Sequence, residues 1–242
     1  IGPGSSSLDA WAAPLNLSAS KYDPRALYDP IHDRFIIACL NGFDNTTSEI
    51  IVGFSQSGDP TGGWNLYALP GDPNNDTLWT DYPIMALNEH ELFITGNLLR
   101  NGEPWQTGFD RSLCWQIDLE SAYSGSSLVT RLWDNFSFGN GRIRNLCPVQ
   151  GGSSPVGTNM YPLSNRNFDV ANDTVFYMEI TDTINGNPTL NVNFGLTDVD
   201  YGMPPNAVQQ FTQLLQTNDA RWLDAVIENG NIVERGNHEE LI

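Results

Sequence analysis

A short pattern recurs along this chain and limits the folds that the chain can adopt. The first copy opens with Asp23-Pro24-Arg25 and passes through a polar turn into Arg34-Phe35-Ile36-Ile37. A second copy opens with Asp81-Tyr82-Pro83, a third with Asp219-Ala220-Arg221, and a weaker one near Asn159. A repeated pair of strand-like runs indicates a structural unit that packs against further copies of itself.

The spacing of the copies predicts the architecture. They start at residues 23, 81, 159 and 219, so the intervals are 58, 78 and 60 residues. A kelch-like propeller blade takes about 50 residues, so we predict an all-β fold, a β-propeller of four-stranded antiparallel blades with loop insertions. About three blades and the start of a fourth fit, fewer than a closed propeller needs. We therefore expect a partial propeller, completed by further sequence or by another chain.

The residues between these copies also favour strands. Short β-branched and aromatic runs alternate with clusters of Gly, Pro, Asn and Asp, and helical periodicity is nearly absent. Residues 207–215 could form two turns of helix or a long loop. Residues 1–20, rich in Gly, Ser, Ala and Pro, predict an extended arm or linker before a propeller fragment at 21–242.

Charge excludes two classes of partner. The chain has 11 Lys and Arg against 29 Asp and Glu, a formal net charge of −18. A nucleic-acid binder needs a basic face, and an anionic membrane surface would repel this chain. The longest apolar run, residues 35–40, is far shorter than the roughly 20 residues of a spanning helix. We expect neither nucleic-acid binding nor membrane insertion.

One turn resembles the Asp box of sialidase-type propellers. Ser57-Gly58-Asp59-Pro60-Thr61-Gly62-Gly63-Trp64 keeps the residue types of that box, with Thr61 and Gly63 exchanged. Asp and Ser side chains can hydrogen-bond the local backbone, and Gly permits a tight turn. The pattern predicts the turn between the third and fourth strands of a blade, and it implies a fold rather than a chemistry.

The chain also resembles a group of secreted, mostly bacterial propeller proteins of largely uncharacterised function. The shared features are Asp23 to Asp29, Arg34-Phe35, Ser55 to Trp64 and Asp81-Tyr82-Pro83. The match is close over residues 22–97 and looser over about 145–230. The resemblance implies an extracellular or cell-surface β-propeller, often a module of a larger protein, and transfers no catalytic residue.

A second resemblance, in the tail of the chain, does not indicate an ATPase. Residues 229–241 are similar to the last strand and switch region of ATP-binding-cassette ATPases. Those enzymes need a P-loop lysine that cradles phosphates, whereas the one lysine of this chain, Lys21, lies in Ala19-Ser20-Lys21-Tyr22. We interpret the similarity of the tail as coincidence.

Candidate binding residues come from the starts of the repeats and from two tryptophans. If the Asp and Arg at the repeat starts form an ion pair or cap a turn, their role is structural. If they form a charged rim at the mouth of the central channel, they would bind a small anionic or sugar-like ligand. Trp105 and Trp133, expected on exposed loops, could stack on sugar rings or anchor a protein partner. The repeat-start candidates are Asp23, Arg25, Asp81, Asp219 and Arg221.

Metal and thiol chemistry has weak support. His32, His90 and His238 are scattered and are interpreted as solvated residues of turns or the tail. The oxygen-rich segments 71–76 and 198–202 could hold calcium, although neither has the spacing of a calcium loop. No other cofactor is predicted. Cys39 is expected to be buried, and a disulfide between Cys114 and Cys147 is left open.

These observations predict a non-enzymatic recognition, adhesion or scaffold module of a larger secreted or surface protein. Acidity, the scarcity of lysine and the family resemblance support an extracellular location. We expect a protein or carbohydrate ligand. The alternative is a propeller glycoside hydrolase with two carboxylates some 5 to 10 Å apart, for which Asp81 and Asp219 are the candidates.

Overall fold

The computed structural model describes residues 6–151, 155, 157–166 and 168–203, and the backbone of 207–208, 214–215, 222–228 and 231–236. Its main elements are three four-stranded antiparallel sheets. The first consists of β1 (Lys21–Asp29), β2 (Arg34–Asn41), β3 (Glu49–Ser55) and β4 (Trp64–Pro70). The second consists of β5 (Leu78–Leu87), β6 (Glu91–Arg100), β7 (Phe109–Asp118) and β8 (Thr130–Trp133).

The third sheet has the order β11-β13-β14-β15. These strands are β11 (Cys147–Pro148), β13 (Pro162–Asn165), β14 (Asn172–Ile180) and β15 (Leu190–Tyr201). Beside it, β12 (Gln150–Gly151) pairs in parallel with β18 (Trp222–Glu228), which pairs with β19 (Asn231–Gly236). Two small hairpins are β9 (Ser137–Phe138) with β10 (Gly141–Arg142), and β16 (Ala207–Val208) with β17 (Leu214–Leu215).

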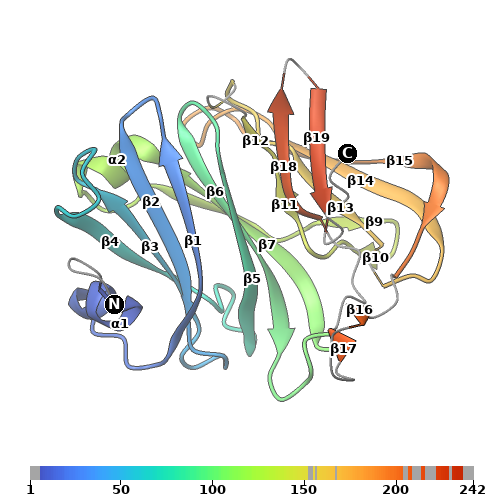
Figure 1. Cartoon of the computed structure of the whole chain (residues 1–242), viewed down its shortest axis with the longest axis horizontal. Coiled ribbons are helices and arrows are strands. Elements are labelled where there is room, and N and C mark those ends of the chain that lie inside the picture. The colour runs from blue at the N-terminus through green and yellow to red at the C-terminus, as the bar shows by residue number, and fades with distance from the viewer. Residues whose placement is uncertain are drawn as a thin grey trace.

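The sheets follow one another side by side. In Figure 1 β1 and β5 are neighbours, and the β11–β12 segment lies beside β5 and β18. The prediction of a mostly-β fold with repeated four-stranded antiparallel sheets is confirmed. Closure of the sheets into a propeller ring is not detected in the part of the chain that the structure describes.

Strand β6 supplies two hydrophobic cores. Its residues alternate between the two faces of the sheet. Leu92 and Ile94 join the cluster between the first and second sheets, with Phe54 and Trp115. Phe93 points the other way into the cluster between the second and third sheets. That second cluster also holds Cys114, Phe136, Phe176 and Met178.

The strand repeats align on proline rather than on aspartate. In β1 the register shifts between Tyr22 and Arg25, and in β5 it shifts between Asp81 and Ile84. Each bulge contains an X-Pro pair whose first residue has positive φ, Asp23 at 49° and Tyr82 at 60°. Proline has no N–H for the ladder, and a bulge accommodates it. Matching Asp23 with Asp81 is therefore wrong by one residue, because Tyr22 is the counterpart of Asp81.

The segment before β1 is not extended throughout. Residues 8–15 form α1 (Leu8–Ala12) and the 3-10 helix η1 (Ala13–Leu15). They pack on Cys39 and Ile51 of the first sheet. Gly53 lets the Trp11 ring lie against β3, because a Cβ at that position would overlap it. The expected extended arm instead covers one face of a sheet over this part of its length.

Other local expectations can now be judged. Asp59 Oδ1 accepts hydrogen bonds from the Thr61 N–H at 2.9 Å and hydroxyl at 2.7 Å, in the turn that joins β3 to β4 as predicted. Within 207–215 the described residues form the short strands β16 and β17. Helix α2 (Leu119–Ser124) was not predicted. Among the residues described, no helix is long and apolar enough to cross a membrane.

The cysteines belong to the packing. Cys39 and Cys114 are buried free thiols, so no disulfide joins Cys114 to Cys147. Burial raises the pKa of the Cys39 thiol to about 11 and raises that of Cys114 further. Such thiols stay protonated and unreactive near neutral pH.

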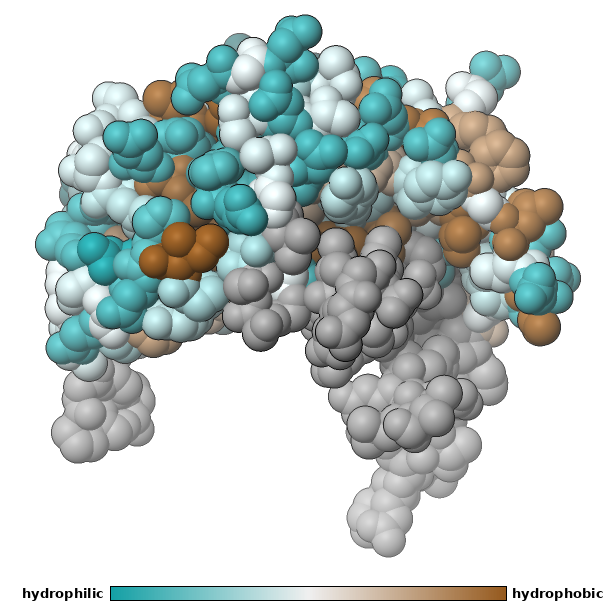
Figure 2. Space-filling view, turned by 90° about the horizontal axis from the view of Figure 1, so that it is seen from above, coloured by the Kyte–Doolittle hydropathy of each residue, from teal (hydrophilic) through white to brown (hydrophobic). Residues whose placement is uncertain are grey.

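The surface is mostly hydrophilic in the view of Figure 2. Hydrophobic atoms gather at the end of the molecule where β15 lies. The strongly exposed apolar residues of that strand are Phe194, Leu196 and Val199. Exposed apolar side chains are common on protein surfaces, so this group by itself does not define a site.

Candidate functional site

The predicted binding residues of β1 and β5 lie at the bulges. Asp23 is exposed, and the half-buried Arg25 donates from Nε to the Pro83 carbonyl oxygen at 3.1 Å. Arg25 therefore ties the first sheet to the second, as a structural residue would. Asp81 is half-buried in β5. Asp219 and Arg221 lie outside the described residues.

The two tryptophans have different surroundings. Trp133 is buried in β8, and its Nε1 donates to Gln116 Oε1 at 2.9 Å. The expectation that it stands on an exposed loop is wrong, because its ring fills the second core. Trp105 is half-buried in the β6–β7 loop with its ring 5.8 Å from that of Phe168.

One candidate site is a cleft of about 540 Å³, here called the hairpin cleft. It lies at the end of the sheets where the β1–β2 and β5–β6 turns meet α2 and the β14–β15 loop, at the upper end in Figure 1. Its walls come from three sheets. The lining residues are His32, Glu89, His90, Asp118, Leu119, Glu120, Tyr123, Thr183 and Asn185.

The two hairpins at this cleft use the same turn device. In the β1–β2 turn, Asp29 Oδ1 accepts hydrogen bonds from the N–H groups of Ile31 at 2.9 Å and His32 at 3.2 Å. In the β5–β6 turn, Asn88 Oδ1 accepts from the N–H groups two and three residues later, at 2.9 and 2.7 Å. Asp and Asn side chains favour such turns. Each turn brings one histidine to the cleft, although at different positions: His32 is the third residue after Asp29, and His90 is the second after Asn88.

The carboxylate of Asp29 links the β1–β2 turn of the first sheet to helix α2, which follows the third strand of the second sheet. Its side chain is 1 % exposed, and Oδ2 accepts from Tyr123 Oη at 2.6 Å and lies 2.7 Å from His32 Nδ1. Burial alone would raise the pKa of Asp29, but the hydrogen bonds from Tyr123, His32 and the backbone lower it below its usual value. Burial and the bond to Asp29 raise the pKa of Tyr123. The carboxylate thus holds both rings at the cleft wall.

Glu91 is the second buried carboxylate at this end. Oε2 accepts from Gln116 Nε2 and Oε1 from the Ile184 N–H, both at 2.6 Å. Burial raises the pKa of Glu91 in spite of these bonds, and the nearby Asp118 adds to the rise. Its oxygens fasten the β14–β15 loop to the second sheet.

This arrangement suits binding. The carboxylate oxygens of Asp29 and Glu91 accept hydrogen bonds from protein donors. Asp118 is the N-cap of α2 and accepts from the Ser121 N–H at 2.8 Å. The side chain of His32 is 40 % exposed, with Nδ1 engaged by Asp29. Nε2 is then the ring nitrogen left to meet a ligand. Carboxylates, an imidazole and an amide around a tyrosine ring can hydrogen-bond and stack on a polar ligand.

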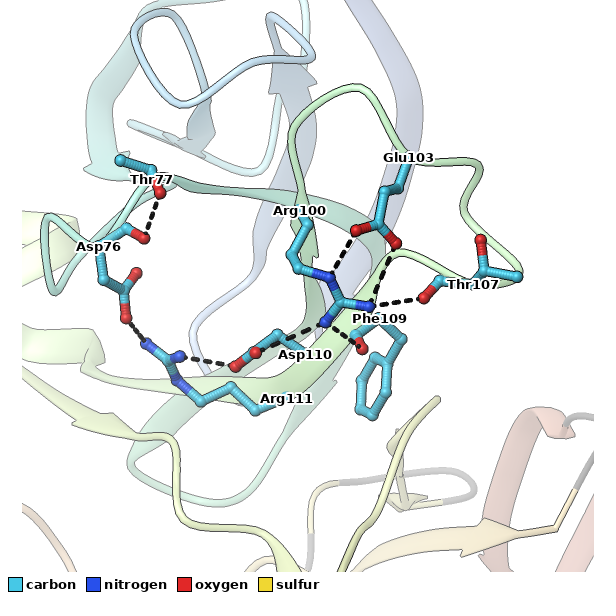
Figure 3. A network of polar contacts seen from close by, with 8 residues as sticks. All are labelled: Asp76, Thr77, Arg100, Glu103, Thr107, Phe109, Asp110 and Arg111. Carbon is cyan, nitrogen blue, oxygen red and sulfur yellow. Dashed lines mark hydrogen bonds and ion pairs between the residues drawn. The ribbon is translucent and has the colours of Figure 1, made fainter.

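The suggested calcium segments are otherwise occupied. Asp72 accepts from the backbone N–H groups of Asp76 at 3.1 Å and Thr77 at 2.9 Å. Asp76 pairs with Arg111 in the network of Figure 3. Residues 198–201 lie in β15 rather than in a loop. Within the described ranges no three His, Cys, Asp or Glu side chains group as metal ligands.

The turns could be predicted from the sequence, but their partners could not. His32 and His90 are exposed turn residues, as expected, whereas Asp29, Glu91 and Tyr123 were not singled out. The available signal was an Asx residue at the same place in two repeated hairpins, each followed by histidine. Tyr123 lies 94 residues from Asp29, and no local pattern shows that pairing.

Comparisons with known proteins add no relative. No family model, no curated protein and no solved structure matches this chain.

Proposed function

We propose that this chain is part of a non-enzymatic recognition module, a partial β-propeller of a secreted or surface protein that binds a carbohydrate in the hairpin cleft. The observation that carries the proposal is a cleft of about 540 Å³ with turns of three sheets in its walls. The buried carboxylates behind its wall, Asp29 and Glu91, are already hydrogen-bonded within the protein. Groups that can bind a polar ligand therefore stand at the cleft wall.

The charge of the cleft selects among sugars. Glu89, Asp118 and Glu120 stand at its wall with Thr183 and Asn185. An acidic saccharide would be repelled, whereas hydroxyl or amino groups could donate to these oxygens. Tyr123 and His32 offer ring surface for a pyranose face. The ligand that fits is a neutral or basic saccharide.

The test is a panel of neutral, basic and acidic oligosaccharides titrated into the full chain. Neutral or basic members should bind, and Glu120→Gln should weaken them by several-fold. Glu103→Gln is the matched control, because Glu103 is an exposed acid in the loop at the opposite end of β6. Binding confined to acidic sugars, or an equal loss in both variants, would contradict the proposal.

The glycoside hydrolase alternative is less well supported. A general acid needs a raised pKa and an open path to the glycosidic oxygen. Glu91 has the raised pKa, but Gln116 and the Ile184 N–H occupy its oxygens. Turnover of an aryl glycoside that Glu89→Gln or Glu120→Gln abolishes would favour the hydrolase.

The partial propeller has its own test. If further sequence completes the ring, intact mass spectrometry of the native protein should give a mass well above 26.8 kDa. If another chain completes it, native mass spectrometry should give a complex while the denatured chain gives 26.8 kDa. A native monomer of that mass would contradict both routes to closure.

A further inference from the structure

A second hollow gathers arginines in a strongly acidic chain. It has a volume of about 150 Å³ and lies beside β10, the end of β13 and the start of β7. Arg142, Arg144 and Arg166 line it, although the chain carries only 11 basic residues against 29 acidic ones. We call it the arginine pocket. Like charges gathered around one small hollow repel one another unless something compensates them.

Arg144 is fixed in place. Its guanidinium carbon lies 4.8 Å from the ring centre of Phe109 and 4.5 Å from that of Phe168. Nη1 donates to the Gln106 carbonyl at 3.2 Å and Nη2 to the Trp105 carbonyl at 3.1 Å. Stacking on the two rings and hydrogen bonds to the two backbone carbonyls hold the Arg144 guanidinium at the wall of the arginine pocket.

Arg142 and Arg166 keep donors for a ligand. Arg166 stacks on Phe176 with its guanidinium carbon 4.8 Å from the ring centre, and Arg142 is exposed. Neither forms an ion pair with any described carboxylate, in contrast to Arg100 and Arg111. The acid at the pocket is Asp169, which accepts from Asn172 Nδ2 at 2.6 Å.

The walls strengthen this positive site. Phe109, Ile143, Phe168 and Phe176 surround it with apolar surface. Apolar walls lower the local dielectric and make charge interactions stronger than in water. Guanidinium groups bind carboxylate, sulfate and phosphate oxygens in pairs. A volume of about 150 Å³ has room for such a group.

We propose that the arginine pocket binds a small oxyanion, a carboxylate, sulfate or phosphate group, with Arg166 and Arg142 as its donors. The pocket is at the end of the second sheet where β7 begins, and the hairpin cleft is at the end where β7 leads into α2. The inference goes beyond the proposed function and does not depend on it. Loss of sugar binding would leave it intact.

The experiment titrates sodium acetate, sulfate and phosphate into the full chain by calorimetry, with sodium chloride keeping the ionic strength constant. At least one of the three should bind saturably. Arg166→Gln should weaken that binding by about tenfold or more, the loss expected for a charge-assisted hydrogen bond. The anion that binds most tightly identifies a planar carboxylate or a tetrahedral group.

Arg131→Gln is the matched control, because Arg131 is an exposed arginine that stacks on Trp133 at 4.4 Å to the ring centre. It should leave anion binding unchanged. Arg142→Gln is the second variant, since an exposed residue can be replaced with little risk to folding. Absence of saturable binding by all three anions would overturn the proposal. Wild-type affinity in both Arg166→Gln and Arg142→Gln, or an equal loss in Arg131→Gln, would also overturn it.

Discussion

The β1–β2 and β5–β6 hairpins occupy equivalent places in two repeats and are built around different side chains. Both turns close on an Asx oxygen that accepts two backbone N–H groups. The first turn uses the charged Asp29, which also holds His32 and Tyr123. The second uses the neutral Asn88, whose Nδ2 donates to the Thr158 carbonyl at 2.8 Å.

The difference shows that one side-chain atom shapes the turn and another decides which groups the turn holds at the cleft. Either side chain satisfies the backbone, because only one acceptor oxygen is needed there. The second oxygen of Asp29 orients an imidazole and a phenol, whereas the amide nitrogen of Asn88 binds a carbonyl. The repeat therefore specifies the hairpin, and one atom of the Asx side chain decides what the hairpin contributes to the cleft.

The largest effect should follow from removing Asp29. Asp29→Ala deprives two backbone N–H groups, His32 and the Tyr123 hydroxyl of their acceptor in a site that is 1 % exposed. We expect a loss of about 3 kcal/mol in the free energy of unfolding, measured by urea denaturation. The exposed Asp33 of the same turn is the control, and Asp33→Ala should cost less than about 1 kcal/mol. Equal costs would show that Asp29 is not the centre of the turn.

The second hairpin should respond less strongly. Asn88→Ala removes two backbone acceptor contacts and the bond to Thr158, for a loss of about 2 kcal/mol. Asn88→Ser keeps a side-chain oxygen that can accept from the turn and loses the donor to Thr158, so about 1 kcal/mol is expected. Denaturation midpoints of the two variants measure the contrast. A larger loss for Asn88→Ser than for Asn88→Ala would contradict the role of the side-chain oxygen in the turn.

A variant of Tyr123 tests whether the charge of Asp29 strengthens the hydrogen bond between them. Tyr123→Phe removes a hydroxyl that donates to a carboxylate and should cost about 1.5 kcal/mol. Tyr67→Phe is matched, because its hydroxyl donates to the neutral Ala122 carbonyl at 3.2 Å and should cost about 0.5 kcal/mol. Thermal denaturation of the two variants compares them. Equal melting temperatures would argue against a charge-assisted bond.

The smallest effect should be that of pH, and the two buried carboxylates should contribute to it in separate pH ranges because their pKa values shift in opposite directions. The folded pKa of Asp29 is lowered, so its contribution is present above the unfolded value near 3.8 and is lost as pH falls through the folded value. The folded pKa of Glu91 is raised, so stability is lost as pH rises from about 4.5 through the folded value. Glu91→Gln should remove the loss of stability as pH rises and leave the loss of stability at acid pH unchanged. Urea denaturation at several pH values separates the two.

Much of the fold was readable because it depends on local pattern. Two strand-like runs on either side of a polar turn predicted the β5–β6 hairpin, and Asp59 with Thr61 predicted the β3–β4 turn. The helix at Leu8–Ala12 was missed, because its position depends on Trp11 meeting Gly53, a contact 42 residues away in the chain. Matching the repeats by their first Asp failed for another reason: the X-Pro pair sets the bulge.

The site was less predictable than the fold. Asp23 and Asp81 were candidates because they open the repeats, yet the buried hydrogen bonds beside the cleft centre on Asp29 and Glu91. Their partners lie in other elements, Tyr123 in α2 and Ile184 in the β14–β15 loop. The arginine pocket assembles in the same way from β10, the segment before β11 and the end of β13. A sequence shows such residues but does not show which of them meet.

The alternation along β6 also affects how the molecule unfolds. Leu92 and Ile94 serve the core toward the first sheet while Phe93 serves the core toward the third. A slip of one residue would exchange these side chains and damage both cores together. Separation of either neighbouring sheet would expose one face of β6 to water. The strand thus makes the stability of one sheet depend on the next, and the three sheets gain cooperativity that no single sheet has.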